Sequence, residues 1–354
     1  NPAHQVAHFP EVFAAEHFSV PQAGLKVGGW QLEPPTQRRL LERLRKAGQP
    51  LGDYCQGHFY RGILTGLNEA FVIPAEQRDE LIAQDPKSAG IIKPFLRGKD
   101  IKRWNVQFAE QYLIKIESSE NKQHPWSGLP LAEAEELFAK TYPAIYTWFI
   151  SEGKRQQLID RTDQGHYFWE LRSCAYWERF EQPKIIVPAI AASPIASIDE
   201  LGYFSNNKST IFIPTSIALA ASCVNSPIAA WLAAQTFSTK QGGFFDFEPR
   251  YSGQIPIPTT SATQLAVIER LVRPITIGLA APEYERLLNG LVYELFFPED
   301  LHAKGIRLFD ACAEAGIADW PASDETAGKK KPATVAKLGL NMRASTTAAE
   351  IFQP

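Results

Sequence analysis

The sequence contains few cysteines. Its 354 residues include only four, Cys55, Cys174, Cys223 and Cys312, and these are widely spaced, with no CxxC pair. This spacing argues against a disulfide framework and against a structural zinc site. Free thiols fit a reducing compartment, and the N-terminus has no basic stretch followed by an apolar signal core. We therefore expect a cytoplasmic protein.

Familiar catalytic signatures are missing as well. The sequence has no P-loop and no GxGxxG motif after a predicted strand. Its acidic residues Asp53, Glu69, Asp100, Asp163 and Glu170 are too scattered for a metal-dependent nuclease centre, and no PD…ExK-like spacing occurs. We expect neither a catalytic centre nor a metal site in this chain.

Long apolar runs are rare. The stretch from Ile217 to Phe237 is apolar enough to raise the possibility of a membrane span, but it contains Asn225, Ser226 and Pro227. An Asn-Ser-Pro sequence is typical of one helix ending and the next beginning. The stretch therefore predicts a pair of buried helices, and we expect no membrane association.

An excess of positive charge is also absent. The formal net charge is −3 at pH 7, which is at first unfavourable for nucleic-acid binding, because that binding depends largely on Lys and Arg. The distribution is more favourable, since residues 87 to 103 contain Asp100 as their one acidic residue. Such a run can also be a solvated charged face. Its basic residues are Lys87, Lys93, Arg97, Lys99, Lys102 and Arg103.

The chain is long enough, at 45% hydrophobic residues, to bury one large core or two smaller ones. Residues 1 to 50 are predicted to be a connector. Their first 35 residues carry aromatic and His side chains that can pack against a neighbouring domain, and a helix is expected over 36 to 48. The landmarks of that helix are Thr36 as its N-cap, Leu40, Leu41 and Leu44 as its apolar face, and Gly48 with Pro50 at its end.

Residues 51 to 260 mix short β-prone runs with helical segments, whereas apolar residues in 261 to 315 recur at helical spacing. After residue 316 the composition shifts to Ala, Thr, Ser and Lys. We predict an α+β domain with a mixed or antiparallel sheet, followed by a helical subdomain and an irregular tail over 316 to 354. The expected strands are Phe71–Ile73, Tyr112–Ile116, Lys184–Val187 and Thr210–Ile213, and residues 131 to 140 are expected to be helical.

The stretch RGILTGLNEAFVI, residues 61 to 73, sets turn chemistry and polar side chains within apolar sequence. Gly66 permits a positive φ or a close backbone approach, and β-prone residues flank it. The pattern predicts a hairpin that presents Arg61, Thr65 and Asn68 to a ligand. Asn68 has two interpretations, since its side chain can cap the turn or can offer the donor and acceptor pair that recognises adenine.

A second segment, residues 161 to 179, interleaves aromatic with hydrogen-bonding side chains. Gln164 and Gly165 are expected to form a turn that projects Arg161, Gln164 and His166 outward. Arg, Lys, Asn and Gln read base edges, and aromatic faces stack on exposed bases. The alternative is that the aromatic residues of this segment are simply core.

Four further stretches follow one another along the chain: KPFLRGKDIKRW at 93 to 104, RTDQGHYFWELRSCAYWERFEQPKII at 161 to 186, GGFFDFEPRYSGQIPIP at 242 to 258 and LLNGLVYELFFPEDL at 287 to 301. Together with residues 61 to 73, this ordered set resembles the TaqI-like C-terminal specificity domain of adenine-specific DNA methyltransferases, including the single-chain type IIG restriction–modification enzymes. The resemblance covers roughly residues 45 to 310 and implies that residues 51 to 260 are a DNA target-recognition domain.

The resemblance also implies partners. Enzymes of this family methylate through a separate N-terminal domain that binds S-adenosylmethionine and carries an Asn-Pro-Pro-aromatic motif. The nearest sequences here, NPAH at Asn1 and EPPT at Glu33, have no aromatic residue after two prolines, and the only Met is Met342. We expect this chain to be the specificity part of a larger enzyme, with double-stranded DNA and a methyltransferase domain as its partners and no cofactor of its own. The parent would methylate adenine, with or without cleaving DNA, in phage defence.

The loop around Lys240 and Gly242-Gly243 is suited to a phosphate, or is a solvated turn, and Arg250 lies beside it in sequence.

A function of another class is also open. The chain could be a protein-interaction or scaffold domain of a multi-subunit DNA-modification or phage-defence system, which the acidic net charge favours. If the chain instead recognises DNA, the expected DNA-binding residues are Arg61, Thr65, Asn68, Lys93, Arg97, Lys99, Arg103, Arg161, Gln164, His166, Arg172, Lys240 and Arg250.

Overall fold

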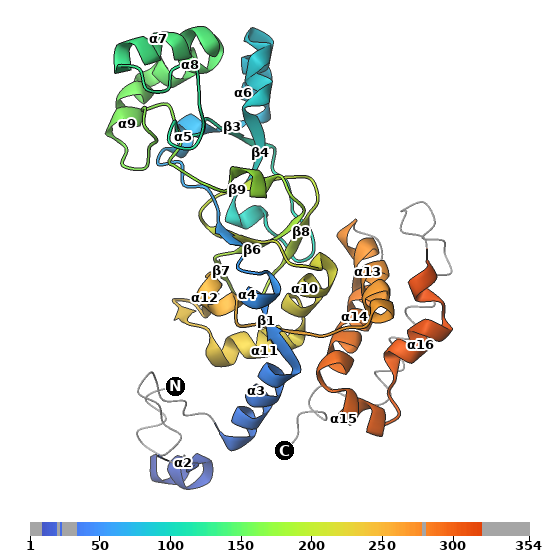
Figure 1. The fold of residues 1–354 in the computed structure, drawn as a ribbon. Helices are drawn as coiled ribbons and strands as arrows, with labels where there is room; N and C mark the ends of the chain where they lie inside the picture. The colour runs from blue at the N-terminus through green and yellow to red at the C-terminus, as the bar shows by residue number, and fades with distance from the viewer. Residues whose placement is uncertain (1–8, 20–21, 23–33, 278–280, 321–354) are drawn as a thin grey trace.

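The computed structural model of the chain describes residues 9–19, 22, 34–277 and 281–320. They form an elongated molecule with helices α7 (Leu131–Thr141), α8 (Pro143–Ile150) and α9 (Lys154–Asp160) at one end (Figure 1). The described residues form four small sheets, and helices stand between many of their strands along the chain. The predicted α+β class is confirmed.

The sheet at the centre has the strand order β2-β10-β6-β8, and all its neighbours are antiparallel. Its strand β6 reads KIIVP and is buried along its whole length. Because successive side chains of a strand point to opposite faces, Ile185 and Val187 enter one hydrophobic cluster and Ile186 enters another. The central sheet therefore separates two cores. Its strands are β2 (Phe59–Arg61), β10 (Ser209–Phe212), β6 (Lys184–Pro188) and β8 (Ser197–Asp199).

The first core lies under helices α7 to α9 and α6 (Ala75–Gln84), beside a second four-stranded sheet. Large aromatic rings fill it, and the rings of Phe138 and Trp169 stack with their centroids 5.0 Å apart. In this sheet the pair β4–β9 is parallel and the others are antiparallel. Its strands are β3 (Val72–Pro74), β5 (Gln111–Ile114), β4 (Ile92–Leu96) and β9 (Phe204–Ser205).

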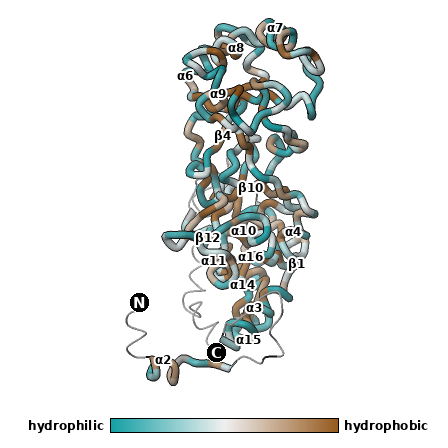
Figure 2. Tube along the Cα trace, turned by 90° about the vertical axis from the view of Figure 1, so that its left-hand side faces the viewer, coloured by the Kyte–Doolittle hydropathy of each residue, from teal (hydrophilic) through white to brown (hydrophobic). Residues whose placement is uncertain are grey.

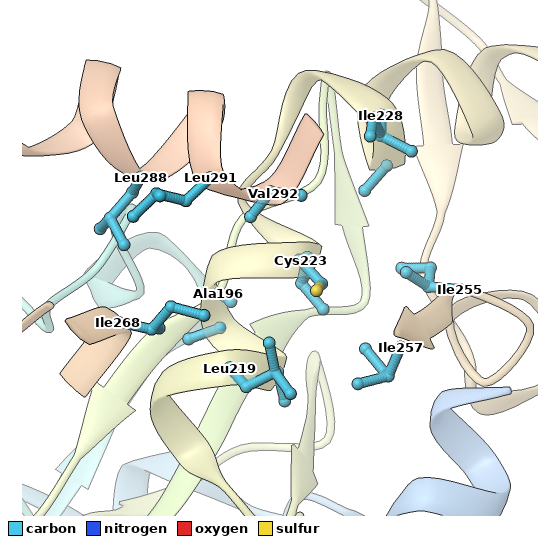
Figure 3. Packing of buried hydrophobic residues seen from close by; sticks show 14 of the residues in the cluster. Ala196, Leu219, Cys223, Ile228, Ile255, Ile257, Ile268, Leu288, Leu291 and Val292 are labelled. Atoms are coloured by element: carbon cyan, nitrogen blue, oxygen red, sulfur yellow. The ribbon is translucent and has the colours of Figure 1, made fainter. Parts of the chain in front are cut away.

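The second core is mainly helical. Leu219 and Cys223 of α10 (Ile217–Val224) lie between α14 and strand β13 (Figure 3). Strand β13 (Pro256–Pro258) pairs with β1 (Gly48–Pro50), so the end of the predicted connector is built into the fold. The remaining helices of this part are α3 (Pro35–Ala47), α4 (Leu51–Tyr54), α11 (Pro227–Thr236), α12 (Pro249–Ser252), α13 (Ala262–Thr276), α14 (Ala281–Phe296), α15 (Pro298–Ala303) and α16 (Leu308–Glu314), and the short α2 (Phe9–Glu16) precedes them.

The expected hairpin over residues 61 to 73 is wrong. Strand β2 belongs to the central sheet and β3 to the second sheet, and the short helix α5 (Asn68–Phe71) lies between them. The chain leaves the central sheet after β2 because α5 and β3 bury Phe71 and Ile73 in the first core. Gly66 has the predicted positive φ, +70°.

The other expected strands are present within one to two residues of their predicted ends, and the helix expected at 131 to 140 is α7. Helix α3 begins at Pro35 rather than after a Thr36 cap, because a proline loses nothing in the first turn, where its missing N–H would have no partner. Leu41 and Leu44 are buried as expected, and Leu40 is half-buried. Gly48 is extended, and an added Cβ would lie 2.4 Å from the backbone of Ile257, so only glycine permits this close pairing.

The apolar stretch from Ile217 forms the expected pair of helices, and the hydroxyl of Ser226 caps the second by accepting a hydrogen bond from the N–H of Ala229. No single described helix is long and apolar enough to cross a membrane, although the pair α10 and α11, bent by 59°, passes that test by length and composition together. Most of α10 is buried in the second core. The irregular tail predicted for 316 to 354 lies outside the described residues from 321 onward.

Candidate nucleic-acid interface

The two segments singled out in the sequence meet in space. One hollow of about 220 Å³ is lined by the end of strand β2 with the residues after it, Arg61 to Leu64, and by the loop from Arg172 to Trp177. They are more than 100 residues apart along the chain, and no local pattern predicts this contact. We refer to this cavity as the hollow.

Tyr176 joins the two sides of the hollow. Its hydroxyl donates a hydrogen bond of 3.1 Å to the carbonyl oxygen of Arg61, and its ring lies 4.8 Å from that of Tyr60. Burial raises the pKa of Tyr176 to about 12, with a further contribution from Cys174, and the nearby Arg61 and Arg172 oppose that shift. The hydroxyl therefore stays protonated and continues to donate at physiological pH.

Arg161 does not project outward, which corrects the interpretation of this residue as a base reader. The side chain is buried, and its guanidinium donates to the carbonyl oxygens of Thr65, Phe168 and Glu170. It also lies over the ring of Phe71, 4.4 Å from its centroid. Burial lowers the pKa of Arg161 to about 10. Arg161 is thus a positioning residue, which fixes the segment of residues 61 to 68 against the loop that follows α9.

Thr65 is buried too, so the expectation that it contacts a ligand is wrong for its side chain. Its hydroxyl donates a 2.7 Å hydrogen bond to Oδ1 of the exposed Asn68. This bond supports the interpretation of Asn68 as a residue that stabilises its own turn. The amide nitrogen of Asn68 donates to no residue that the structure describes, so its N–H groups stay available to donate to a ligand.

The loop from Gln164 to Leu171 closes on itself, because these two residues form an antiparallel bridge. The turn predicted at Gln164-Gly165 is therefore wrong, and Gln164 is half-buried rather than projected. His166 is exposed as expected, with its backbone N–H donating to the buried carboxylate of Glu170 at 3.0 Å. Glu170 also accepts from Trp126 Nε1 at 2.9 Å, so it organises the loop. Tyr167, Phe168 and Trp169 are buried, and the alternative that these aromatics are core is correct.

The predicted basic run divides into several roles. Lys93 forms an ion pair with Glu181 at 3.3 Å, and Arg97 pairs with the buried Asp100 at 3.1 Å. Lys99 is exposed. The expectation that Arg103 binds DNA is wrong, because its guanidinium binds Glu285 of α14 and the carbonyl oxygen of Asn225. That residue joins the sheet region to the helical part and is not available to a phosphate.

The basic loop around Lys240 is a hairpin of β11 (Thr239–Lys240) and β12 (Phe244–Asp246), whose turn projects from the side of the molecule (Figure 2). Lys240 and Arg250 both pair with the buried Asp246, at 3.3 and 3.4 Å. Burial raises the pKa of Asp246, but the backbone N–H of Glu248 and the two basic side chains outweigh it and hold the pKa below its ordinary value. Lys240 and Arg250 remain exposed and are close enough for one phosphate to contact both.

The register of the central sheet places several basic residues at one end. Arg61 lies opposite Thr210, which lies opposite Val187, so the end of β2 and the turn before β10 are adjacent. That turn carries Lys208, an exposed residue that the sequence did not single out, although its Asn-Asn-Lys sequence is a turn signal. An added Cβ at Gly98 would lie 3.3 Å from the carbonyl oxygen of Lys208, which places Lys99 nearby. Arg61, Lys99, Arg172 and Lys208 form what we call the basic end.

Among the residues that the structure describes, Arg61, Lys99 and Lys208 have no ion-pair partner. Arg172 is 3.2 Å from Asp163 but is 61% exposed. The basic end therefore offers cations to solvent, within a chain whose net charge is negative.

Residues 93–257 match the family model of the TaqI-like C-terminal specificity domain. The chain contains a TaqI-like C-terminal specificity domain. The matched range includes the loop at the hollow, Lys208 and the β11–β12 hairpin, whereas Arg61 to Asn68 precede it. The hollow is thus lined both by residues of the matched range and by residues that precede it.

Solved structures that match the chain include the type IIL restriction–modification enzyme MmeI in complex with DNA, at 10% identity and a TM-score of 0.43 over 81% of this chain. They also include the type IIG restriction endonuclease BpuSI, at 14% identity and a TM-score of 0.38 over 76% of this chain. The chain spans about a third of the length of each, 35% and 34%. No curated protein matches the chain.

The described residues contain no group of three or more His, Cys, Asp or Glu side chains that could hold a metal ion. The four cysteines are free. Burial raises the pKa of Cys55, Cys223 and Cys312 to about 12, so these thiols stay protonated and behave as small apolar side chains.

Proposed function

We propose that this chain recognises a specific sequence in double-stranded DNA for an adenine-specific DNA methyltransferase of a restriction–modification enzyme. One observation carries the proposal: the hollow and the basic end are adjacent in a chain that contains a specificity domain. Base recognition needs hydrogen-bonding side chains on a rigid support, and the phosphates on either side need cations. The central sheet supplies the support here.

The proposed division of labour follows from exposure. Arg61, Lys99 and Lys208 contact phosphates, because they are exposed basic residues without described ion-pair partners. Asn68 is the first candidate for a base contact, since its side chain is exposed and its amide nitrogen donates to no described residue. Gln164 is the second, although its half-buried amide nitrogen donates to the carbonyl oxygen of Ile159 at 3.5 Å. Lys240 and Arg250 contact the phosphate backbone of the DNA further along the duplex.

The basic end gives a direct test. Replacing Arg61, Lys99 and Lys208 together by Ala should weaken binding to all duplexes and flatten its dependence on salt. Each lost phosphate contact should reduce the slope of log affinity against log salt concentration by about 0.9. Fluorescence anisotropy with a labelled duplex at several salt concentrations measures this slope.

A matched control removes the same charge elsewhere, at the exposed Arg45, Lys46 and Lys304 on the helical part. We expect this variant to keep most of the wild-type slope. Equal slopes for the basic-end variant and the wild-type protein would mean that Arg61, Lys99 and Lys208 do not contact phosphates.

A second prediction concerns sequence specificity. Asn68→Ala or Gln164→Ala should cost roughly 1–3 kcal/mol of binding free energy against the cognate sequence and little against random DNA. Because Asn68 accepts from Thr65, the melting temperature of the variant must be measured alongside. Methylation-sensitive sequencing of DNA from cells that carry the intact gene identifies the cognate site. Two folded variants with undiminished preference would contradict the assignment.

We further propose that S-adenosylmethionine binds to a methyltransferase domain and not to this chain, since neither an Asn-Pro-Pro-aromatic motif nor a glycine-rich cofactor loop occurs in its sequence. The isolated chain should show no methyl transfer and no cofactor binding. Isothermal titration calorimetry with S-adenosylmethionine checks this, and saturable one-to-one binding would contradict it.

A protein-interaction role remains a second candidate because of α2. Phe9 and Phe13 of this helix, and Phe18 after it, are exposed. Exposed aromatic residues that are close together are typical of surfaces that bind another protein. The neighbour would be the methyltransferase domain under the first proposal, or a separate subunit under the second. DNA binding by the chain alone favours the first.

A further inference from the structure

We propose that the hollow holds one nucleotide that has left the DNA duplex. The inference rests on the proposed function and adds the ligand of this site. It starts from Trp177, which lines the hollow and is 5% exposed. Its indole Nε1–H is buried and has no acceptor among the described residues. A buried donor without a partner costs free energy, so an acceptor supplied from outside would stabilise this arrangement.

Trp169 provides the comparison within the same protein. Its Nε1–H also has no described partner, but its ring is fully buried between Phe138 and Tyr167, with centroids 5.0 and 4.8 Å away. Trp169 is not among the residues that line the hollow, whereas Trp177 is. Of the two tryptophans, Trp177 is therefore the one whose unpartnered donor indicates a binding site at the hollow.

The rim of the hollow is cationic. Arg61 and Arg172 are both exposed and both lie close enough to Tyr176 to lower the pKa of its hydroxyl. That hydroxyl already donates to the carbonyl of Arg61, so it offers the hollow its ring rather than its hydrogen bond. The site thus presents donors and positive charge, and its ligand must supply acceptors and negative charge.

The walls decide between a bare phosphate and a nucleotide. The half-buried ring of Tyr176 gives the hollow a flat, apolar wall, beside the buried side chains of Trp177 and Ile63 that also line it. A phosphate would leave this wall exposed to water, whereas a base would cover it by stacking. At about 220 Å³ the hollow is smaller than the roughly 300–1,000 Å³ clefts that hold drug-sized ligands. One base with a carbonyl oxygen for Trp177, and its phosphate between the arginines, matches this size and chemistry.

The first experiment tests the site without a duplex. The full chain is labelled with ¹⁵N at its tryptophan side chains, and the indole signal of Trp177 is assigned by its loss in Trp177→Phe. Thymidine 5′-monophosphate should shift this signal and leave that of Trp169 in place. Arg61→Gln with Arg172→Gln should weaken the binding at least about tenfold, as expected for the loss of charge-assisted contacts.

Inorganic phosphate and thymidine are titrated separately. An equal shift with inorganic phosphate alone would show that the hollow is a phosphate site and would overturn the proposal. So would the absence of any shift of Trp177 at about 10 mM nucleotide, well above a dissociation constant of about 1 mM.

The second experiment tests the nucleotide within DNA. A duplex with one unpaired thymidine should bind more tightly than the same duplex without it, because no base pair must open. Trp177→Phe should remove this gain, and the control Trp231→Phe, on α11 outside the hollow, should keep it. Melting temperatures confirm that each variant is folded, and the paired arginine variant is measured in the same way.

The outcomes are distinguishable. Equal binding to both duplexes would overturn the nucleotide pocket and leave the recognition of paired DNA intact. No binding to either duplex would remove the proposed function together with the inference.

Discussion

Replacing Asp199 by Ala is expected to lower the free energy of unfolding by about 3–5 kcal/mol, because it leaves a buried charge without a partner. Asp199 and Lys184 are both 0% exposed and form an ion pair in the central sheet. Burial lowers the pKa of Lys184, and Asp199 opposes that shift. The carboxylate also accepts from the backbone N–H groups of Leu201 at 2.8 Å and Tyr203 at 2.9 Å.

Urea denaturation of the purified chain measures the effect. The control is Asp79→Ala, since Asp79 pairs with Arg78 but is 64% exposed, and a change within about 0.5 kcal/mol is expected there. Adding Lys184→Met to Asp199→Ala should recover part of the lost stability, because it removes the unpaired ammonium group. A loss below about 1 kcal/mol in Asp199→Ala would show that Lys184 is not held as a buried cation.

The second large effect is expected at Arg161. Replacement by Ala removes a guanidinium that is 7% exposed and donates to three backbone carbonyls. Hydrogen bonds from a charged group contribute about 1.5–3 kcal/mol each, so a loss of about 3 kcal/mol or more of unfolding free energy is expected. The free energy of unfolding of Arg161→Lys should lie between those of the wild-type protein and Arg161→Ala, since an ammonium keeps the charge but cannot span three acceptors in the same geometry.

Arg172→Ala should show the opposite profile. Its side chain is 61% exposed, and its one ion pair within the described part of the chain is with Asp163, so stability should hardly change while DNA affinity falls. Unfolding and DNA binding are measured on both variants. If Arg161→Ala keeps its stability and loses DNA affinity, Arg161 contacts DNA directly and its assignment as a positioning residue is wrong.

The sequence predicted local features well where neighbours along the chain decide them. Gly66 has its positive φ, strand β6 lies where KIIV is β-prone, and Asn-Ser-Pro separates α10 from α11. It failed at residues 61 to 73 because a hairpin and two strands in separate sheets have the same local pattern. Only the pairing of β2 with β10, about 150 residues further along, distinguishes them.

The candidate site shows the same division. Arg61 and Arg172 were identified from residue type and adjacent turns, and both line the hollow. Arg161 has the same chemistry and a similar sequence context, yet it is buried. An arginine's role depends on whether backbone carbonyls surround it, and these carbonyls come from residues as far as 96 positions away. The composition of the sequence and the spacing of its residues do not show which backbone carbonyls surround an arginine.

By itself the sequence determined the α+β class, the helical C-terminal part, the resemblance to a specificity domain and most of the basic residues that reach solvent. Those properties follow from residue type, periodicity and motif order, which are local or additive. Only the tertiary structure decided that Arg103 binds Glu285, that Lys208 joins Arg61 at one end of the central sheet, and that Trp177 faces a hollow. Each of these depends on strand register and long-range packing, because a shift of one residue in a strand moves every side chain to its other face.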